Sequence, residues 1–227
     1  MSEPVKTGKR RRYDSSRRRA AARETRRAIL DAARALFLDH GYARTTITAI
    51  AQAAAVSVET IYISVGPKAA VVRYLVETAL SGADEPVPAE ERDWVQGFRS
   101  EPDPRLKIRL HAAPAITEMH QRLAPLWAVL LEAAPGDPEL RSLIHELNER
   151  RIGHMRLMVE HLAAAGGLRP GLSMDMAADV VWATNSSEFF LLLVRDRGWH
   201  PKAFQRWLAE AWIDLLLAPR TERRDEA

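Results

Sequence analysis

Three groups of polar residues in this 227-residue chain are of types that could do chemistry. The first is a run of hydroxyl, carboxylate and phenol side chains between residues 44 and 68. The second is a basic segment ahead of it, and the third is a set of histidines in the second half of the chain. Hydroxyl and cationic groups donate to phosphates, and carboxylates and apolar groups read base edges, whereas histidine serves acid–base catalysis and metal binding.

The stretch from Thr45 to Lys68, TTITAIAQAAAVSVETIYISVGPK, predicts two short helices joined by a tight turn. Thr46 and Ser57 are placed to cap these helices at their N-termini. A small inward residue, Ala51, lets the helices approach closely, and Ile61 is expected to be buried between them. The pattern indicates a helix-turn-helix that reads DNA in the major groove. A helical hairpin without a DNA role is the alternative on spacing alone.

The second short helix would present its exposed side chains to DNA. Val58 and Ile63 would contact thymine methyl groups, whereas Tyr62 would donate to a phosphate. The carboxylate of Glu59 either accepts a hydrogen bond from cytosine N4 or only complements the helix dipole. The predicted DNA-contact residues are Arg44, Thr46, Thr48, Ser57, Val58, Glu59, Thr60, Tyr62, Ile63, Ser64 and Lys68.

The first 27 residues are strongly basic. They carry eleven lysines and arginines against three carboxylates, a net charge of +8, whereas the other residues carry 22 against 27, a net charge of −5. A basic head on an acidic body is expected of a chain that meets a polyanion at one end. This arm would follow the minor groove or neutralise phosphates nonspecifically, and a solvated tail is the alternative. Its predicted contact residues are Lys9, Arg10, Arg11, Arg12, Arg17, Arg18 and Arg19.

The histidines of the second half form no recognised catalytic or metal-binding motif. His145 and Glu149 are four residues apart, and His154 and His161 lie two turns apart on one helical face. The sequence has no HExxH motif, phosphate loop or nucleophile elbow, and it has no cysteine. We therefore predict that the chain is not an enzyme and has no catalytic residue, no cofactor and no metal site.

The hydrophobic pattern is helical along almost the whole chain and predicts an all-α protein of about nine helices. A first amphipathic helix, with Ile29, Ala33 and Phe37 on one face, is expected to end at Gly41. Later helices are expected over 47–54, 58–64, 68–80, 105–121, 122–134, 138–165, 174–197 and 201–218. The predicted domains are a basic arm (1–22), a helix-turn-helix DNA-binding domain (23–68), a connecting helix (69–81), a helical effector-binding and dimerisation domain (82–218) and a charged tail (219–227).

Two segments near the C-terminus, 174–197 and 201–218, predict a homodimer. Both are apolar on nearly all sides, which implies burial against the chain's own core and against a second copy. A two-fold dimer would present two recognition helices to the half-sites of a symmetric operator. The predicted interface residues are Phe189, Leu192, Phe204, Trp207, Leu208, Trp212 and Leu215.

The middle helices offer tryptophan, methionine and histidine side chains for a ligand pocket. Such a lining suits an apolar or aromatic small molecule with a polar handle, although each residue could equally be ordinary core. The polar run 185–188 inside an apolar segment would line this pocket or reach the surface. The predicted pocket residues are His111, Met119, Trp127, His154, Met155, Met158, Trp182 and Asn185.

Residues 26–77 resemble the N-terminal domain of the tetracycline-repressor (TetR-like) family of transcriptional regulators. The residues that carry the resemblance are Gly41-Tyr42, Thr45-Thr46, Ile50-Ala51, Ala54-Ala55-Val56-Ser57, Thr60-Ile61-Tyr62 and Lys68. Three positions depart from the family pattern: Ala55 replaces a glycine, Ser64-Val65 replace His/Tyr-Phe, and Ala69 replaces an acid. If the turn at Ala55 is left-handed, alanine costs about 1 kcal/mol there.

The resemblance implies a ligand-binding and dimerisation domain after the DNA-binding domain. Together with the residue evidence, it predicts a dimeric regulator, a repressor that a small-molecule effector releases from a two-fold symmetric DNA operator. The alternative is a nonspecific nucleoid-type binder that uses the basic arm. No signal-peptide pattern occurs, and the longest apolar run, Phe189 to Val194, is far shorter than a membrane span, so a cytoplasmic protein without membrane contact is expected.

Overall fold

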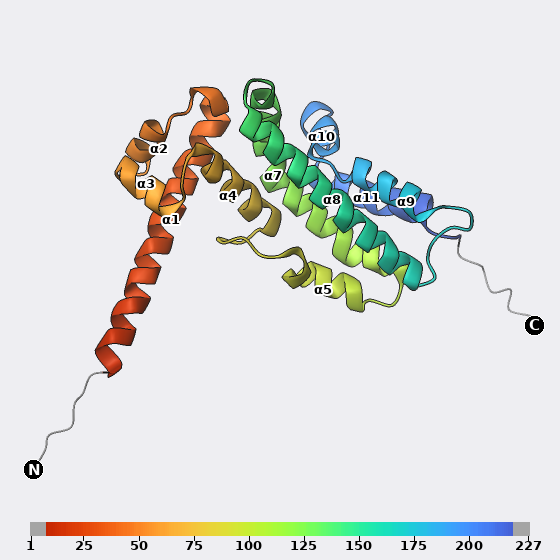
Figure 1. Cartoon of the computed structure of the whole chain (residues 1–227). Coiled ribbons are helices and arrows are strands. Elements are labelled where there is room, and N and C mark those ends of the chain that lie inside the picture. Colours follow the sequence, from red (N-terminus) through yellow and green to blue (C-terminus); the bar gives the residue numbers. More distant parts are fainter. Residues whose placement is uncertain (1–7, 220–227) are drawn as a thin grey trace, which may run out of the picture. The chain divides into compact units, whose positions relative to one another are not determined.

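The computed structural model describes residues 8–219, with side chains from residue 17 onward. Within these residues the chain is helical and contains no strand, only an isolated bridge between Leu168 and Leu217. The all-α prediction is therefore confirmed. The chain divides into two compact units, Met1–Leu75 and Val76–Ala227, and Figure 1 shows the helices of both.

The first unit packs three helices around a small core. The helices are α1 (Gly8–Arg44), α2 (Ile47–Ala53) and α3 (Val58–Ser64), and α4 (Lys68–Ser81) begins in this unit and crosses into the second. The predicted stripe of α1 is buried, as are Ile50 of α2 and Ile61 of α3, and each of these three helices contacts the other two. At Gly41 the backbone of α1 leaves the right-handed region, with φ at 77°, where glycine has no steric penalty.

The second unit is a helical bundle around a larger core. Buried Ile108, Leu162, Val181, Phe204 and Trp212 belong to this core, and α7 packs against α11 while α8 packs against α9. Its elements are η1 (Ala89–Glu91), α5 (Asp93–Ser100), α6 (Pro104–Leu106), η2 (Lys107–Ala112), α7 (Ala113–Ala133), η3 (Ala134–Gly136), α8 (Pro138–Ala164), α9 (Met174–Thr184), α10 (Ser187–Phe190), η4 (Leu191–Asp196) and α11 (Pro201–Leu216).

Two predicted helix boundaries in this unit are wrong. The expected break at 121–122 is absent, because α7 runs on past Pro125 with Leu123 and Leu126 held in the core. Conversely, the expected helix over 174–197 is interrupted at Asn185, where φ is −94° and ψ is 58°. Ser186 then caps a new helix, since its side chain accepts a hydrogen bond from the Phe189 amide at 3.1 Å.

Helix α5 lies in a region where the sequence predicted no helix, and a buried lysine anchors its C-terminal end. The Nζ of Lys107 donates hydrogen bonds to the carbonyl oxygens of Phe98 at 2.6 Å and Arg99 at 3.2 Å. The last carbonyls of a helix lack partners within the helix, so this ammonium satisfies two of them. Burial lowers the pKa of Lys107.

Taken singly, no helix within residues 8–219 is long and apolar enough to cross a membrane. Only α2 and α3 taken together have that length and composition, and this pair is bent by 98°.

Candidate functional site

The N-terminal ends of α2 and α3 are fixed by the two side chains predicted to cap them. The Thr46 hydroxyl accepts a hydrogen bond from the Ala49 amide at 3.1 Å, and the Ser57 hydroxyl accepts one from the Thr60 amide at 3.0 Å. The Ser57 and Thr60 hydroxyls also lie 2.8 Å apart. Each cap satisfies an amide at the start of its helix, so the first turn of α3 is held in a defined orientation.

The turn between α2 and α3 places Ala55 in the left-handed region, with φ at 54°. Among the described residues it is the one non-glycine residue with positive φ. In this conformation the Cβ crowds the following carbonyl oxygen, a strain that glycine lacks.

We expect Ala55→Gly to stabilise the first unit by about 1 kcal/mol, because it removes the left-handed strain. The measurement is hydrogen exchange of the full chain, read on peptides that cover α2 and α3. Ala53→Gly is the matched control: Ala53 is also exposed but is helical, so glycine there should reduce protection by about 0.5–1 kcal/mol. Equal effects of the two substitutions would contradict the strain at Ala55.

Helix α3 exposes an apolar and aromatic surface of a kind that water does not favour. Ile63 is 78% exposed, Tyr62 is 53% exposed and Val58 is 37% exposed, whereas Ile61 is fully buried and fixes the helix to its unit. Thr46, Thr48, Ser57 and Glu59 are exposed as well, and Thr60, Ser64 and Lys68 are partly buried. The structure thus places most of the predicted contact set on the surface of one helix pair.

Two cations among the predicted DNA-contact residues already have partners within the chain. The Lys68 ammonium lies over the ring of Tyr42, 3.9 Å from its centroid, and Arg44 Nε donates to the carbonyl oxygen of His40 at 2.7 Å. Both contacts hold the cation near the end of a helix. Thr45 was not among the predicted site residues, yet it is buried and donates to the carbonyl oxygens of Leu36 and Gly41, which secures the end of α1.

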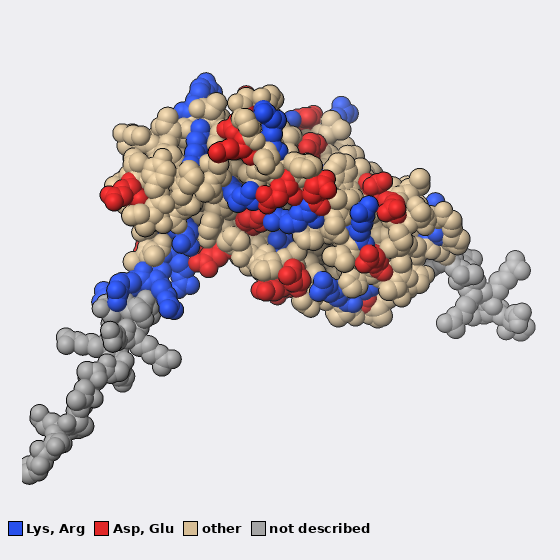
Figure 2. All heavy atoms as spheres, viewed as in Figure 1, with Lys and Arg blue, Asp and Glu red and all other residues tan. Residues whose placement is uncertain are grey.

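From Gly8 onward, the basic arm forms the N-terminal part of α1. Arg17, Arg18 and Arg19 are exposed on this helix, and Figure 2 shows the cations gathered there. The side chains of Lys9, Arg10, Arg11 and Arg12 lie outside the described residues. A helix with arginines at successive positions presents positive charge in several directions, which suits attraction to a polyanion more than reading of one base.

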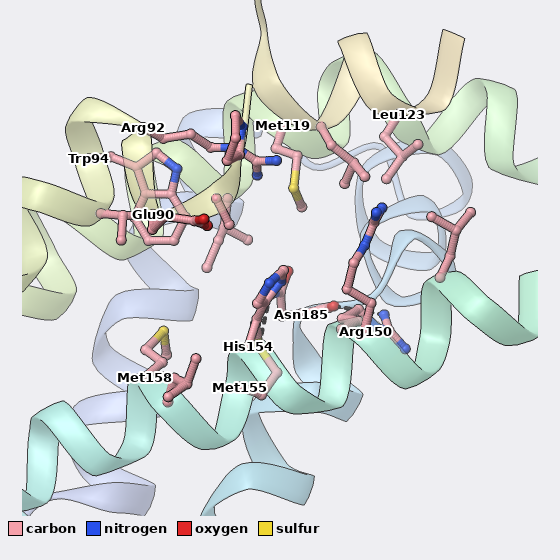
Figure 3. Close-up of a pocket in the computed structure, with 18 of the residues that line it drawn as sticks. Glu90, Arg92, Trp94, Met119, Leu123, Arg150, His154, Met155, Met158 and Asn185 are labelled. Carbon is pink, nitrogen blue, oxygen red and sulfur yellow. Dashed lines mark hydrogen bonds between the residues drawn. The ribbon is translucent and has the colours of Figure 1, made fainter. Parts of the chain in front are cut away.

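The second unit contains a cavity of about 520 Å³. Figure 3 shows side chains from α5, α7 and α8 around it. Of the predicted pocket residues, it is lined by Met119, Trp127, His154, Met155, Met158 and Asn185. His111 and Trp182 do not line it: the His111 ring lies against Gly97, and Trp182 stacks with Arg151.

A buried hydrogen-bonded network forms part of the cavity wall and centres on His120. His120 Nε2 lies 2.9 Å from Asn185 Oδ1, and its Nδ1 lies 3.3 Å from the Ser187 hydroxyl. Because Asn185 Nδ2 points to the sulfur of Met155 at 3.2 Å, its Oδ1 is the acceptor and His120 Nε2 carries the proton. Burial lowers the pKa of His120 to about 4, so the imidazole is neutral at pH 7.

Next to this network, three further long-range contacts hold the break between α9 and α10. Arg151 donates to the carbonyl oxygen of Asn185 at 2.9 Å, and its guanidinium lies 4.4 Å from the centroid of the Trp182 ring. The indole of Trp127 donates to Glu188 at 2.9 Å. One signal in the sequence pointed to this arrangement, the polar run 185–188. No signal pointed to Arg151, which comes from a different helix, α8.

Three residues predicted for a dimer interface lie instead in the core of the second unit. Phe204, Leu208 and Trp212 are fully buried within the chain, because α11 packs against α7 and α9. Their apolar spacing reflects the intrachain core, which the sequence pattern could not separate from an interface. Leu192 at 53%, Leu215 at 47% and Trp207 at 37% remain exposed, and Phe189 is partly exposed.

Residues 29–75 match the sequence model of the family described as bacterial regulatory proteins, tetR family. The matched segment runs from the second half of α1 into α4 and contains the capped α3 described above. The resemblance to the tetracycline-repressor family is therefore confirmed for the DNA-binding domain. No curated protein matches the chain.

Solved structures of regulators share the fold over most of the chain. NalD, described as the secondary repressor of the MexAB-OprM multidrug efflux pump in Pseudomonas aeruginosa, gives a TM-score of 0.68 at 21% identity, covering 88% of this chain and 100% of NalD. SmeT in its complex with triclosan gives a TM-score of 0.65 at 20% identity, covering 86% of this chain and 92% of SmeT. At these identities the likeness establishes the shared fold alone.

Proposed function

We propose that this chain, which carries a TetR-type DNA-binding domain on the fold of TetR-family regulators, is a sequence-specific transcriptional repressor. The observation that carries the proposal is the surface of α3 within the matched residues 29–75. A capped helix that exposes Val58, Tyr62 and Ile63 has a surface suited to thymine methyls and phosphates in a major groove. Two such helices in a homodimer would read a two-fold symmetric operator.

The dimer is proposed to form through the apolar residues of the second unit that the chain leaves uncovered. Leu192, Trp207 and Leu215 come from η4 and α11, and an exposed apolar set of this kind favours a partner surface. A dimer that binds double-stranded DNA has no need of a membrane, so we propose a cytoplasmic location.

A small-molecule effector is proposed to bind the 520 Å³ cavity and to release the operator. Val76, Glu77 and Leu80 of α4 line the cavity, and the same helix begins at Lys68 in the DNA-binding unit. A ligand that binds two arrangements of α4 unequally would shift the balance between a state that fits DNA and one that does not. NalD and SmeT, with the same fold, are described as a repressor and as a triclosan complex, which supports this role.

The decisive experiment is selection of bound duplexes from a random DNA pool by the purified full-length chain, followed by sequencing. A two-fold symmetric enriched site would support a dimeric specific repressor and would supply a probe for effector screening. The alternative is a nonspecific binder that uses the basic arm. In that case no site would be enriched and all duplexes would bind with the same affinity, whereas a specific reader loses about 4–10 kcal/mol when its site is scrambled to nonspecific DNA.

We expect Glu59→Ala to change which base is preferred, and Tyr62→Ala to weaken binding to all sequences. Loss of a carboxylate that accepts from cytosine removes about 1–3 kcal/mol of discrimination at one base pair, whereas loss of a phosphate contact lowers affinity about ten-fold without changing the preference. Fluorescence anisotropy on all single-base variants of the selected site measures both effects.

Glu24→Ala is the matched control for charge, because it removes an exposed carboxylate from α1 and leaves α3 intact. It should leave the base preference as it is. If Glu59→Ala behaves like Glu24→Ala, then Glu59 complements the helix dipole and reads no base.

A further inference from the structure

The wall of the cavity carries more positive than negative charge. Two glutamates, Glu77 and Glu90, face four arginines, Arg92, Arg99, Arg150 and Arg151, among the lining residues. Charges placed against a cavity are partly removed from water, and a surplus of one sign there is unfavourable until a ligand of the opposite sign binds. The arrangement of these cations therefore bears on the chemistry of the ligand.

Arg92 is the clearest of these cations. Its Nε and one terminal nitrogen both donate to the carbonyl oxygen of Val87 at 3.2 Å, and it forms no salt bridge with any described residue. Burial is the main cause that lowers the pKa of Arg92. The nearby carboxylates of Glu77 and Glu90 raise this pKa, and the positive charges of Arg150 and Arg122 lower it. The guanidinium groups of Arg92, Arg122 and Arg150 thus outnumber the two nearby carboxylates. One terminal nitrogen of Arg92 has no partner among the described residues.

Arg150 and His154 complete the polar wall. Arg150 donates to Glu77 at 2.8 Å, which already occupies that carboxylate. Burial and then the positive charges of Arg150 and Arg92 lower the pKa of His154, so its imidazole is neutral and one ring nitrogen carries a proton that can be donated. Figure 3 shows Arg92, Arg150 and His154 around the same cavity.

Arg151 adds a further positive charge to the cavity wall. Its guanidinium is held by a carbonyl oxygen and by the face of Trp182, and it forms no salt bridge among the described residues, although the nearby carboxylate of Glu188 partly offsets its charge. Burial lowers its pKa, as for Arg92. A second desolvated cation in one cavity repels a cationic ligand and attracts an anionic one.

The rest of the lining is mostly apolar and is interleaved with these polar groups. It includes Trp94, Met119, Leu123, Met155 and Met158, drawn from α5, α7 and α8 (Figure 3). Methionine and tryptophan adapt to flat or irregular apolar groups, so this part of the lining suits the body of an aromatic or branched molecule.

We infer that the cavity binds a small organic anion, with its acidic group on Arg92, Arg150 and His154 and its apolar body against the methionine and tryptophan wall. This inference names the chemical class of the effector in the proposed function and rests on that proposal. A neutral or cationic ligand would leave the surplus of arginine charge unpaired.

A matched pair of fluorescent probes tests the inference on the full-length chain. 1-Anilinonaphthalene-8-sulfonate is an aromatic anion, and N-phenyl-1-naphthylamine has the same ring system without the acid. Arg92→Gln retains a donor for Val87 and removes the charge. We expect it to weaken sulfonate binding about ten-fold and to change naphthylamine binding by less than about two-fold, because an ionic hydrogen bond is lost and the apolar wall is unchanged.

Arg156→Gln is the matched control, because Arg156 is exposed on the same helix α8 as Arg150 but does not line the cavity. It should leave the binding of both probes unchanged, and Arg92→Lys should restore part of the sulfonate affinity. Octanoate should displace the sulfonate at lower concentration than 1-octanol does. Equal effects of Arg92→Gln on the two probes, equal displacement by octanoate and octanol, or no sulfonate binding would overturn the inference.

DNA binding of the same preparations is measured separately by anisotropy. Loss of the proposed function would appear as absence of a specific site, whatever the probes do. Failure of the present inference would appear in the probe comparison, whatever the DNA does.

Discussion

The free energy of unfolding of the second unit should fall by about 3 kcal/mol between pH 6.5 and pH 4 because of His120 alone. Its folded pKa of about 4 lies below the ordinary histidine pKa of 6.5, so the unfolded state takes up a proton in this interval and the folded state does not. The contribution of His120 is fully present above pH 6.5 and is lost as the pH falls through the folded pKa. Stability should thus rise with pH across this window.

Urea titrations followed by tryptophan fluorescence measure this effect. All six tryptophans lie in the second unit, from Trp94 to Trp212, so their emission reports on that unit and not on the DNA-binding unit. Other groups also titrate near pH 4, and a variant is needed to isolate one residue. His120→Gln retains an N–H for Asn185 and does not titrate. The difference in the free energy of unfolding between this variant and the unmodified chain should therefore change by about 3 kcal/mol between pH 6.5 and pH 4.

Parallel curves for the two proteins would mean that His120 is solvated or charged in the folded state. The lowered pKa of His154 acts in the same direction, and it stays in both proteins, so it cancels in the comparison. The pH dependence therefore tests the buried network itself.

Trp212→Ala should destabilise the second unit by about 3–5 kcal/mol. The indole is fully buried in the main core, and its N–H donates to the Thr184 hydroxyl at 2.7 Å, near the end of α9. Truncation would leave a cavity in the core and would leave the partly buried Thr184 hydroxyl without this donor. Urea titration, read on the five remaining tryptophans, gives the change in the free energy of unfolding.

Trp207→Ala is the contrasting variant on the same helix. Trp207 packs edge to face with Trp199 at 6.1 Å and beside Phe189 at 5.5 Å, but it is partly exposed. If the proposed dimer forms through this surface, truncation of Trp207 should act mainly on the dissociation constant of that dimer, measured by sedimentation. If Trp212→Ala weakened dimerisation while leaving the unfolding of the unit unchanged, the placement of α11 would be wrong.

The DNA-binding unit was largely predictable from sequence because its determinants are local. The Thr46 and Ser57 caps each act on an amide three residues away, and the left-handed turn at Ala55 follows from the short link between two helices. Their spacing fixes the geometry without reference to the rest of the chain. The position of Lys68 over Tyr42 joins residues far apart in sequence, and no pattern indicated it.

The second unit was predictable only in class. The spacing of Phe204, Leu208 and Trp212 shows that one face of a helix is buried, but the chain's own core and a partner's surface give the same spacing. The hydrogen bond between His120 and Asn185 joins residues 65 positions apart in the sequence. The cavity arginines Arg92, Arg150 and Arg151 lie in segments whose polar sequence predicts exposure. Such contacts depend on how helices pack, which hydrophobic periodicity does not specify.

The buried anchor at the end of α5 has a consequence for the lifetime of a bound ligand. This helix forms one wall of the cavity through Trp94, Val95 and Phe98, and Lys107 fastens its C-terminal end. Swinging the wall outward at that end would strip a desolvated ammonium of two carbonyl partners, so the easier opening begins at the other end, near η1. We therefore expect the dissociation rate of a ligand to depend on the fraying of this helix as well as on the affinity of the cavity. The same rate would set how soon the ligand-free chain can bind its proposed operator again.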